Sequence, residues 1–216
     1  MKAILIPVKA FRRSKERLAT HYSEDEREAL ARALCEDMFR VVAEVKGIDR
    51  VYVISGEYHA LSLARQLNWR TISESEQISE SASVDAASRH CAEEGVQALL
   101  RLPIDIPLVT ADDIESLFAA LEPAPSAVIV PSYDGTGTNA LLRAPPDLFP
   151  SHFGPGSFAL HAKQAERVGA RISIVRNERI ALDVDEPKEL RAAAERVSPN
   201  SATARLMQRL GLRTPG

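Results

Sequence analysis

The sequence predicts an α/β protein with a mostly parallel sheet, because short apolar runs alternate with helix-like segments through most of the chain. The apolar runs are continuous and rich in Val, Ile and Leu, which is typical of parallel strands covered on both faces. No repeat, low-complexity tract or linker divides the 216 residues, and this length suffices for one hydrophobic core. We therefore expect one domain over residues 1–216, with residues 198–216 as a C-terminal tail.

Eight apolar runs are expected to be strands. They cover residues 3–8, 51–55, 70–72, 98–102, 127–130, 140–143, 172–175 and 180–182, and the run 140–143 is a candidate antiparallel strand.

The helices between these strands carry start and stop signals. They are expected after Ser23, at 61–67, at 83–94, at 111–121, from 157 to about 168 and from Pro187, with one short helix after Ser198. Ser23 and Glu26 form a capping-box pattern, and Gly47 ends the long helix that follows. Thr110 is placed to cap the helix after it, and Pro187 occupies a first helical turn, where proline fits.

The amino-acid composition and net charge indicate which kinds of binding partner to expect. Apolar residues make up 45% of the chain and charged residues 26%, as in an ordinary globular protein. The net charge of −3 gives no sign of nucleic-acid or membrane binding. The amino terminus does not have the pattern of a signal peptide, and no apolar run is long enough to span a membrane. Cys35 and Cys91 have no metal-ligand spacing, so we expect reduced thiols and a cytoplasmic location.

The most informative short segment is residues 100–108, in which an apolar run is followed by Asp105 between two prolines. Pro103 and Pro107 prevent the strand from continuing, which places Asp105 at the carboxyl end of a central strand. Ligands of open α/β sheets bind at this edge. A carboxylate there suits a divalent cation and the phosphates that it carries, although Asp105 is also in a position to cap a turn.

A basic loop follows the first strand at the same edge. Five cationic residues occur within nine positions, namely Lys9, Arg12, Arg13, Lys15 and Arg17. This density of charge suits phosphate groups, and an exposed, solvated loop is the simpler alternative. The loop contains no glycine, so it is neither a Walker loop nor a G-x-G-x-x-G fingerprint.

A second acidic segment, residues 183–187, leads into the helix that Pro187 begins. Asp183 and Asp185 are two positions apart on an extended segment, so their side chains point to the same side. Together with Asp105 they form a candidate site for one or two Mg²⁺ ions, with nucleotide phosphate oxygens as further ligands. The alternative role of Asp185 is to cap the helix.

Two glycine-rich loops lie in the second half of the chain, at residues 134–139 and 153–157. Glycines allow backbone N–H groups to approach an anion, and Thr138 and Ser157 add hydroxyl donors. A helix that starts near Ser157 also directs its dipole at the anion. Two such loops point to a phosphorylated or carboxylated acceptor, and ordinary turns are the alternative. His152 and His161 flank the second loop and are expected to be structural or exposed, because no partner that would set a pKa is apparent.

Taken together, these segments resemble the guanylyltransferases of coenzyme F-420 biosynthesis, which act on 2-phospho-L-lactate, phosphoenolpyruvate or 3-phospho-D-glycerate. The matching segments are residues 6–9, 14–18, 103–108, 135–141, 153–158 with His161, and 182–187. They run in order over nearly the whole chain. The G-T-G-T-N and F-G-x-G-S-F-x-x-H elements are the specific ones.

The resemblance implies a single-domain Rossmannoid, GT-A-like nucleotidyltransferase fold, GTP as substrate with Mg²⁺ as cofactor, and release of pyrophosphate. It implies that the catalytic residues are Lys9, Lys15, Arg17 and Asp105. Of these, Lys9, Lys15 and Arg17 would contact the GTP phosphates, and Asp105 would bind the metal together with Asp183 or Asp185. The acceptor would contact Thr138, Gly154 and Ser157. This chain departs from the family at Ser83, Val84 and Asp85, where a Gly-Leu-Asn-like helix start is usual. Because guanine or its ribose is expected there, Asp85 is a candidate nucleotide contact.

Three other functions stay open at this stage. A molybdenum-cofactor guanylyltransferase normally has a glycine-rich loop after the first strand, and a GT-A glycosyltransferase has a D-x-D motif where this chain has an isolated Asp105. A non-catalytic nucleotide-binding module is expected to lose the carboxylates or the basic loop. The resemblance implies GTP and a phosphorylated carboxylic acid as the partners. The sequence does not name the acid, and the oligomeric state stays open, with a homodimer as one option.

Overall fold

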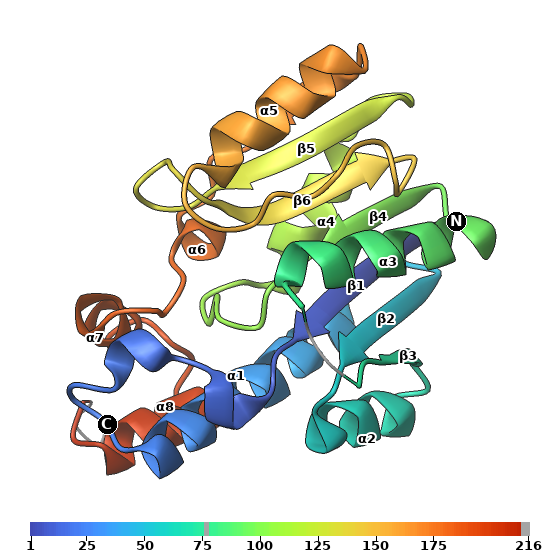
Figure 1. The fold of residues 1–216 in the computed structure, drawn as a ribbon. Coiled ribbons are helices and arrows are strands. Elements are labelled where there is room, and N and C mark those ends of the chain that lie inside the picture. Colours follow the sequence, from blue (N-terminus) through green and yellow to red (C-terminus); the bar gives the residue numbers. More distant parts are fainter. Residues whose placement is uncertain (76–77, 213–216) are drawn as a thin grey trace.

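In the computed structural model, which describes residues 1–75 and 78–212, the chain forms a seven-stranded sheet with helices on both faces (Figure 1). The strands are β1 (Lys2–Val8), β2 (Arg50–Ser55), β3 (Arg70–Ser73), β4 (Ala98–Arg101), β5 (Ser126–Pro131), β6 (Thr138–Ala144) and β7 (Arg171–Ile174). Their order across the sheet is β3-β2-β1-β4-β6-β5-β7.

The pairing confirms the mostly parallel sheet and the antiparallel β6. β1 pairs in parallel with β2 and β4, β2 with β3, and β5 with β7, whereas β6 is antiparallel to both β4 and β5. The direction of winding reverses at β1, because β2 and β3 lie on one side of it and β4 lies on the other. In an open sheet, the crevice beyond the carboxyl ends of β1 and β4 is therefore the expected place for ligands.

The helices connect these strands. They are α1 (Glu24–Glu44), α2 (Tyr58–Gln66), α3 (Glu80–Glu93), α4 (Ala111–Ala119), α5 (Ser157–Arg167), α6 (Glu178–Ala181), α7 (Pro187–Ala194) and α8 (Ala202–Arg209), with 3-10 turns η1 (Phe11–Arg13) and η2 (Glu16–Leu18) after β1. The predicted helix starts are present at three of them. Ser23 forms a capping box with Glu26, Thr110 caps α4, and Pro187 is the first residue of α7.

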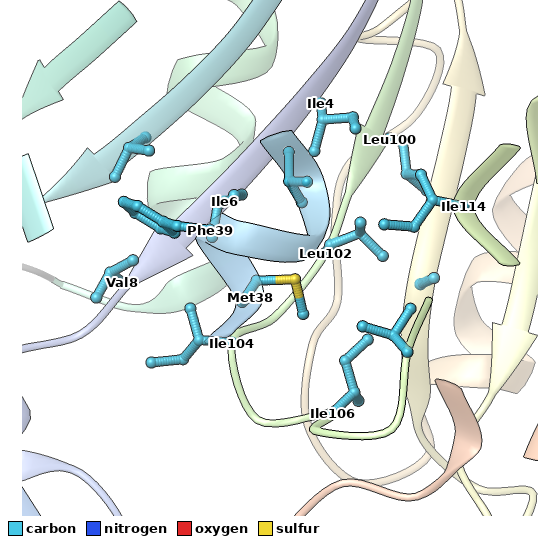
Figure 2. Packing of buried hydrophobic residues seen from close by; sticks show 14 of the residues in the cluster. Ile4, Ile6, Val8, Met38, Phe39, Leu100, Leu102, Ile104, Ile106 and Ile114 are labelled. Atoms are coloured by element: carbon cyan, nitrogen blue, oxygen red, sulfur yellow. The ribbon is translucent and has the colours of Figure 1, made fainter. Parts of the chain in front are cut away.

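Alternate residues of β1 point to opposite faces of the sheet. Ile4, Ile6 and Val8 belong to the buried cluster that includes residues of α1, α2 and α4 (Figure 2). Ala3 and Leu5 belong to a cluster on the other face, which α3 covers. Burial on both faces explains the continuous apolar sequence of the strand, and it anchors the start of the basic loop.

A further buried cluster joins the C-terminal helices α7 and α8 to α1. Leu34 of α1 belongs to it together with Leu190 of α7. Leu182 and Val184 are members of the same cluster. The acidic segment is therefore anchored by a buried side chain on each side of Asp183.

One strand prediction is wrong, and two helices, α2 and α3, begin three residues earlier than expected. Residues 180–182 do not form a strand, because the Asn177 side chain accepts hydrogen bonds from the N–H groups of Arg179 and Ile180 and starts the short helix α6. Helix α3 does not begin at residue 83. It begins at Glu80, because the Ser79 hydroxyl caps it.

The prediction of reduced cysteines agrees with the structure, in which Cys35 and Cys91 are free and buried on opposite faces of the sheet. Burial raises the pKa of the Cys91 thiol to about 12. In the described part of the chain, no helix combines the length and the apolar character needed to cross a bilayer. Part of the expected C-terminal tail forms α8, and residues 213–216 lie outside the described residues.

Candidate active site

A cavity of about 1350 Å³ opens at the carboxyl edge of β1 and β4. The loops after these two strands, both glycine-rich loops and the segment before α7 contribute to its walls. Its lining includes nine of the ten residues to which the resemblance gives a role, with Asp85 as the exception: Lys9, Lys15, Arg17, Asp105, Thr138, Gly154, Ser157, Asp183 and Asp185. The fold therefore brings together residues that are far apart in the sequence.

Lys15 is the centre of the charged wall. Its Nζ lies 2.8 Å from Oδ2 of Asp105 and 3.0 Å from Oδ1 of Asp185, and its side chain is buried. Burial alone would lower the pKa of Lys15, but Asp105 and Asp185 outweigh this effect and raise the pKa, so the ammonium group stays charged. The N-cap of α7 is Glu186, so Asp185 forms this ion pair instead of capping the helix.

Asp183 lies beside the same cluster. The backbone N–H of Val184 donates to the carbonyl oxygen of Asp105 at 2.9 Å, so the loop after β4 lies directly against the acidic segment. The Asn139 amide donates to Oδ1 of Asp183 at 3.1 Å. Burial, followed by the charges of Asp105 and Asp185, raises the pKa of Asp183 to about 6 although Asn139 opposes this shift.

Three carboxylates and one ammonium group leave this cluster with an excess of negative charge, which fits a divalent cation with oxygen ligands. In the described residues, no three acidic, histidine or cysteine side chains already converge on one metal position. The Lys15 ammonium instead lies between Asp105 and Asp185. A cation held by both carboxylates therefore requires Lys15 to turn toward another anion, such as a phosphate group.

Four of the five cations of the basic loop line the cavity, and Arg12 does not. The four are Lys9, Arg13, Lys15 and Arg17. The Arg12 side chain turns toward α1, where its Nε lies 2.9 Å from Oε2 of Glu28. The prediction of one pocket made by all five cations is therefore wrong for Arg12, because acidic residues of α1 bind it.

The two glycine-rich loops meet at another wall of the cavity. The backbone N–H of Phe158 donates to the carbonyl oxygen of Thr136 at 3.1 Å. Gly154 has a φ of 122°, which residues with a Cβ avoid. Ser157 begins α5 and is 1% exposed, and its Oγ has no hydrogen-bond partner in the described part of the chain. A buried hydroxyl without a partner at a helix N-terminus suits an anion that enters the cavity.

His161 has a more specific position than its sequence context predicts. It is buried on α5, its Nδ1 lies 3.0 Å from Oγ1 of Thr138, and its Nε2 accepts the backbone N–H of His152 at 2.9 Å. Burial, with smaller contributions from Arg143 and His152, lowers the pKa of His161 to about 3, so the ring is neutral. The four-residue spacing from Ser157 to His161 is the available sequence signal, because it places both side chains on one face of α5.

Arg101 is a cavity residue that the motifs do not identify. It is the last residue of β4, it is 6% exposed, and its guanidinium carbon lies 4.1 Å from the centroid of the Phe153 ring. The only signal for it is a single charge within the apolar run 98–102. Such a charge in a buried strand needs a specific environment.

Asp85 lies outside the cavity lining. Its Oδ1 accepts the backbone N–H of Ser151 at 2.9 Å and lies 3.7 Å from Nη1 of Arg143. Asp85 is also within α3 and not at its start. Its contacts therefore join α3 to the segment before α5, and they give the predicted nucleotide contact no support.

A sheet of this order, with a carboxylate–lysine cluster and a basic loop at its carboxyl edge, fits the nucleotidyltransferase class that the sequence motifs predicted. Solved structures share the fold. A chain described as a nucleotide-diphospho-sugar transferase from Desulfovibrio desulfuricans G20 superposes with a TM-score of 0.78 at 17% identity, covering 98% of this chain and 96% of that one. CMP:2-keto-3-deoxy-manno-octonic acid synthetase in complex with CTP superposes with a TM-score of 0.58 at 12% identity, covering 89% and 96%.

The chain belongs to the family described as "Guanylyl transferase CofC like", whose model matches residues 1–202. The phosphoenolpyruvate guanylyltransferase of Rubrobacter xylanophilus is 36% identical over 188 residues, which cover 86% of this chain and 90% of the relative. The 2-phospho-L-lactate guanylyltransferase of Methanothermobacter thermautotrophicus is 31% identical over 186 residues, covering 86% and 81%. These comparisons confirm the resemblance on which the sequence prediction rested.

Proposed function

We propose that the protein transfers GMP from GTP to a small phosphorylated carboxylic acid and releases pyrophosphate. The observation that carries this proposal is one cavity that joins a basic loop, a carboxylate cluster and a glycine-rich wall with a buried hydroxyl that has no partner in the described part of the chain. Two anion-binding walls suit two polyanionic substrates. The similar proteins act, by their names, on phosphoenolpyruvate or 2-phospho-L-lactate. These two acids and 3-phospho-D-glycerate are therefore the candidate acceptors.

We assign the GTP phosphates to Lys9, Lys15 and Arg17, which line the cavity beside the carboxylate cluster. The proposed cation is Mg²⁺, held by Asp105 with Asp183 or Asp185, and when bound it would neutralise phosphate charge. The position of Lys15 between two carboxylates supports an exchange of partners. In this exchange the Lys15 ammonium group binds the GTP phosphates, and the two carboxylates bind the cation.

We assign the acceptor to Thr138, Gly154 and Ser157. The buried Ser157 hydroxyl supports this, since it has no hydrogen-bond partner among the described residues and is a suitable donor to an oxygen of the acceptor. The acceptor would therefore bind between this wall and the carboxylate cluster. That arrangement brings its phosphate near the α-phosphate of GTP.

The reaction needs few groups that move protons. An acceptor phosphate oxygen attacks the α-phosphorus of GTP, the bond from that phosphorus to the bridging oxygen of the β-phosphate breaks, and pyrophosphate leaves. A phosphate nucleophile is already ionised at neutral pH, so no general base is required. The protein contributes by bringing two polyanions together and by stabilising their charge with cations and hydrogen-bond donors.

The other functions have less support. A molybdenum-cofactor guanylyltransferase would be expected to have glycines between β1 and η2, where this chain has none. A non-catalytic nucleotide-binding module would not require both the carboxylate cluster and the basic loop, and this cavity contains both.

The direct test is pyrophosphate release from GTP with each of the three acids, with ATP and CTP as controls, before and after chelation of Mg²⁺. We expect pyrophosphate and a guanylylated acid, identified by mass, only when GTP, an acid and Mg²⁺ are all present. Release of pyrophosphate without an acid, or no product with any of the three acids, would contradict the proposal.

A further inference from the structure

Arg101 is a buried cation, and one N–H donor of its guanidinium group has no hydrogen-bond partner among the described residues. Its Nη1 donates to the carbonyl oxygen of Asn139 at 3.2 Å, and its Nη2 donates to the Glu80 carboxylate. The guanidinium carbon lies over the ring of Phe153. Its Nε is buried and has no hydrogen-bond partner in residues 1–75 and 78–212.

The Nε donor belongs to the edge of the guanidinium group that is suited to a carboxylate. Nε and Nη2 present two parallel N–H groups, which can bind both oxygens of a carboxylate. Glu80 contacts only Nη2, so half of this edge is used. The Glu80 side chain is 38% exposed on the first residue of α3, whereas the Arg101 side chain is 7% exposed. Glu80 is therefore the partner that can move away.

Arg101 is also next to the proposed acceptor-binding residues. Phe153, over whose ring the guanidinium carbon lies, immediately precedes Gly154, and Asn139, to which Arg101 donates, immediately follows Thr138. All of these residues line the same cavity. Because the acceptor phosphate has to reach the GTP, the carboxylate is the anionic group that remains for Arg101.

We propose that Arg101 binds the carboxylate of the acceptor through Nε and Nη2, and that Glu80 occupies this edge until the acceptor displaces it. This inference rests on the proposed function and adds a specificity residue to it. Glu80 acts as a competing carboxylate and weakens acceptor binding. Lysine cannot replace Arg101, because an ammonium group keeps the charge but lacks the two parallel donors.

The test measures KM for the acid and for GTP in Arg101→Lys, Glu80→Gln and the double variant. Arg101→Lys should raise KM for the acid about tenfold or more, as expected when a charge-assisted hydrogen-bonded pair is lost, while KM for GTP stays nearly constant. Glu80→Gln should lower KM for the acid by about threefold, because a partly exposed ion pair no longer competes. In the double variant, the Glu80→Gln gain should disappear.

Two controls make the outcomes distinct. Arg50→Lys alters an arginine that lies 2.7 Å from Glu94 at the start of β2, away from the cavity lining, and should leave both KM values unchanged. Glycerol 3-phosphate, which lacks a carboxylate, is tested as a competitive inhibitor against 3-phospho-D-glycerate, and Arg101→Lys should not change its inhibition constant.

The results separate this inference from the proposed function. Suppose that the wild-type enzyme transfers GMP but Arg101→Lys leaves KM for the acid unchanged, or weakens inhibition by glycerol 3-phosphate by the same factor. The Arg101 assignment is then overturned, and the proposed function is not affected. If Glu80→Gln does not lower KM, the displacement is overturned. If the wild-type enzyme uses none of the acids, the proposed function fails, and the assignment fails with it.

Discussion

His161 fixes the direction in which the Thr138 hydroxyl donates its hydrogen. Nε2 of His161 accepts the backbone N–H of His152 at 2.9 Å, so this nitrogen carries no proton. With a pKa of about 3 the ring is neutral, and its proton is on Nδ1. Nδ1 therefore donates to Oγ1 of Thr138 at 3.0 Å, which leaves the hydroxyl hydrogen of Thr138 for another acceptor. Because Thr138 lines the cavity, a bound anion can be that acceptor.

The first prediction tests this relationship with Thr138→Val and His161→Phe. Each should raise KM for the acid by about fivefold to a hundredfold, the range expected when a ligand group loses its hydrogen-bond partner. In a double-mutant cycle the two losses should not add, because His161 acts through Thr138. His161→Asn, which can place a donor at the Nδ1 position, should retain more of the affinity.

Additive losses, or equal losses for GTP and the acid, would mean that His161 only supports the fold. ¹⁵N NMR of labelled histidine gives an independent measurement. It should show His161 with an unprotonated Nε2 over the whole range from pH 5 to pH 8.

The second prediction concerns Asp105. Asp105→Asn should reduce kcat by on the order of 10² or more, the scale for loss of one preorganised electrostatic group, while the protein stays folded. Asp112→Asn, a change on the exposed start of α4, is the matched control and should retain activity. Metal-dependent turnover at the wild-type rate in Asp105→Asn would contradict the metal assignment.

The third prediction compares two arginines of the basic loop. Arg17 lines the cavity, whereas Arg12 pairs with Glu28. Arg17→Ala should weaken GTP binding by roughly 1.5–3 kcal/mol, the usual contribution of a hydrogen bond to a charged group. Arg12→Ala should leave GTP binding unchanged. Calorimetric titration with GTP distinguishes the two variants, and equal effects would show that only the net charge of the loop matters.

The fourth prediction concerns the unpartnered hydroxyl of Ser157. Ser157→Ala should not lower the free energy of unfolding, because the hydroxyl makes no hydrogen bond to any of the described residues. It should nevertheless raise KM for the acid. Urea denaturation together with the pyrophosphate assay measures both quantities. A marked loss of stability with unchanged KM would make Ser157 a structural residue.

The fifth prediction is a pH dependence of stability. Burial opposes ionisation of Asp113, but hydrogen bonds from Arg179, Asn177 and Thr110 outweigh it and lower the pKa to about 2. Since the folded pKa is below the unfolded value, this carboxylate stabilises the protein above about pH 4, by roughly 2 kcal/mol, and the effect is lost as the pH falls toward 2. The difference in unfolding free energy between wild type and Asp113→Asn should therefore shrink from pH 5 to pH 3. A constant difference would contradict the assignment.

Local chemistry accounts for the elements that the sequence predicted well. The caps at Ser23 and Thr110, the proline at the start of α7 and the apolar runs of the strands depend on residues within a few positions of one another. The errors have a different origin. The segment 180–182 is apolar enough for a strand, but the side chain of Asn177 and the packing of Leu182 against the C-terminal cluster favour a helical turn.

The sequence alone also determined the chemistry available to the site. It contains a basic loop, acidic residues near prolines, and glycine loops with hydroxyls, in an order that resembles guanylyltransferases. Only the tertiary structure decided which of these groups meet. It paired Lys15 with Asp105 and Asp185, turned Arg12 away, and left the Ser157 hydroxyl without a partner in the described residues. The physical reason is that such pairings join residues far apart in the chain, and their geometry follows from the packing of the strands and helices that carry them.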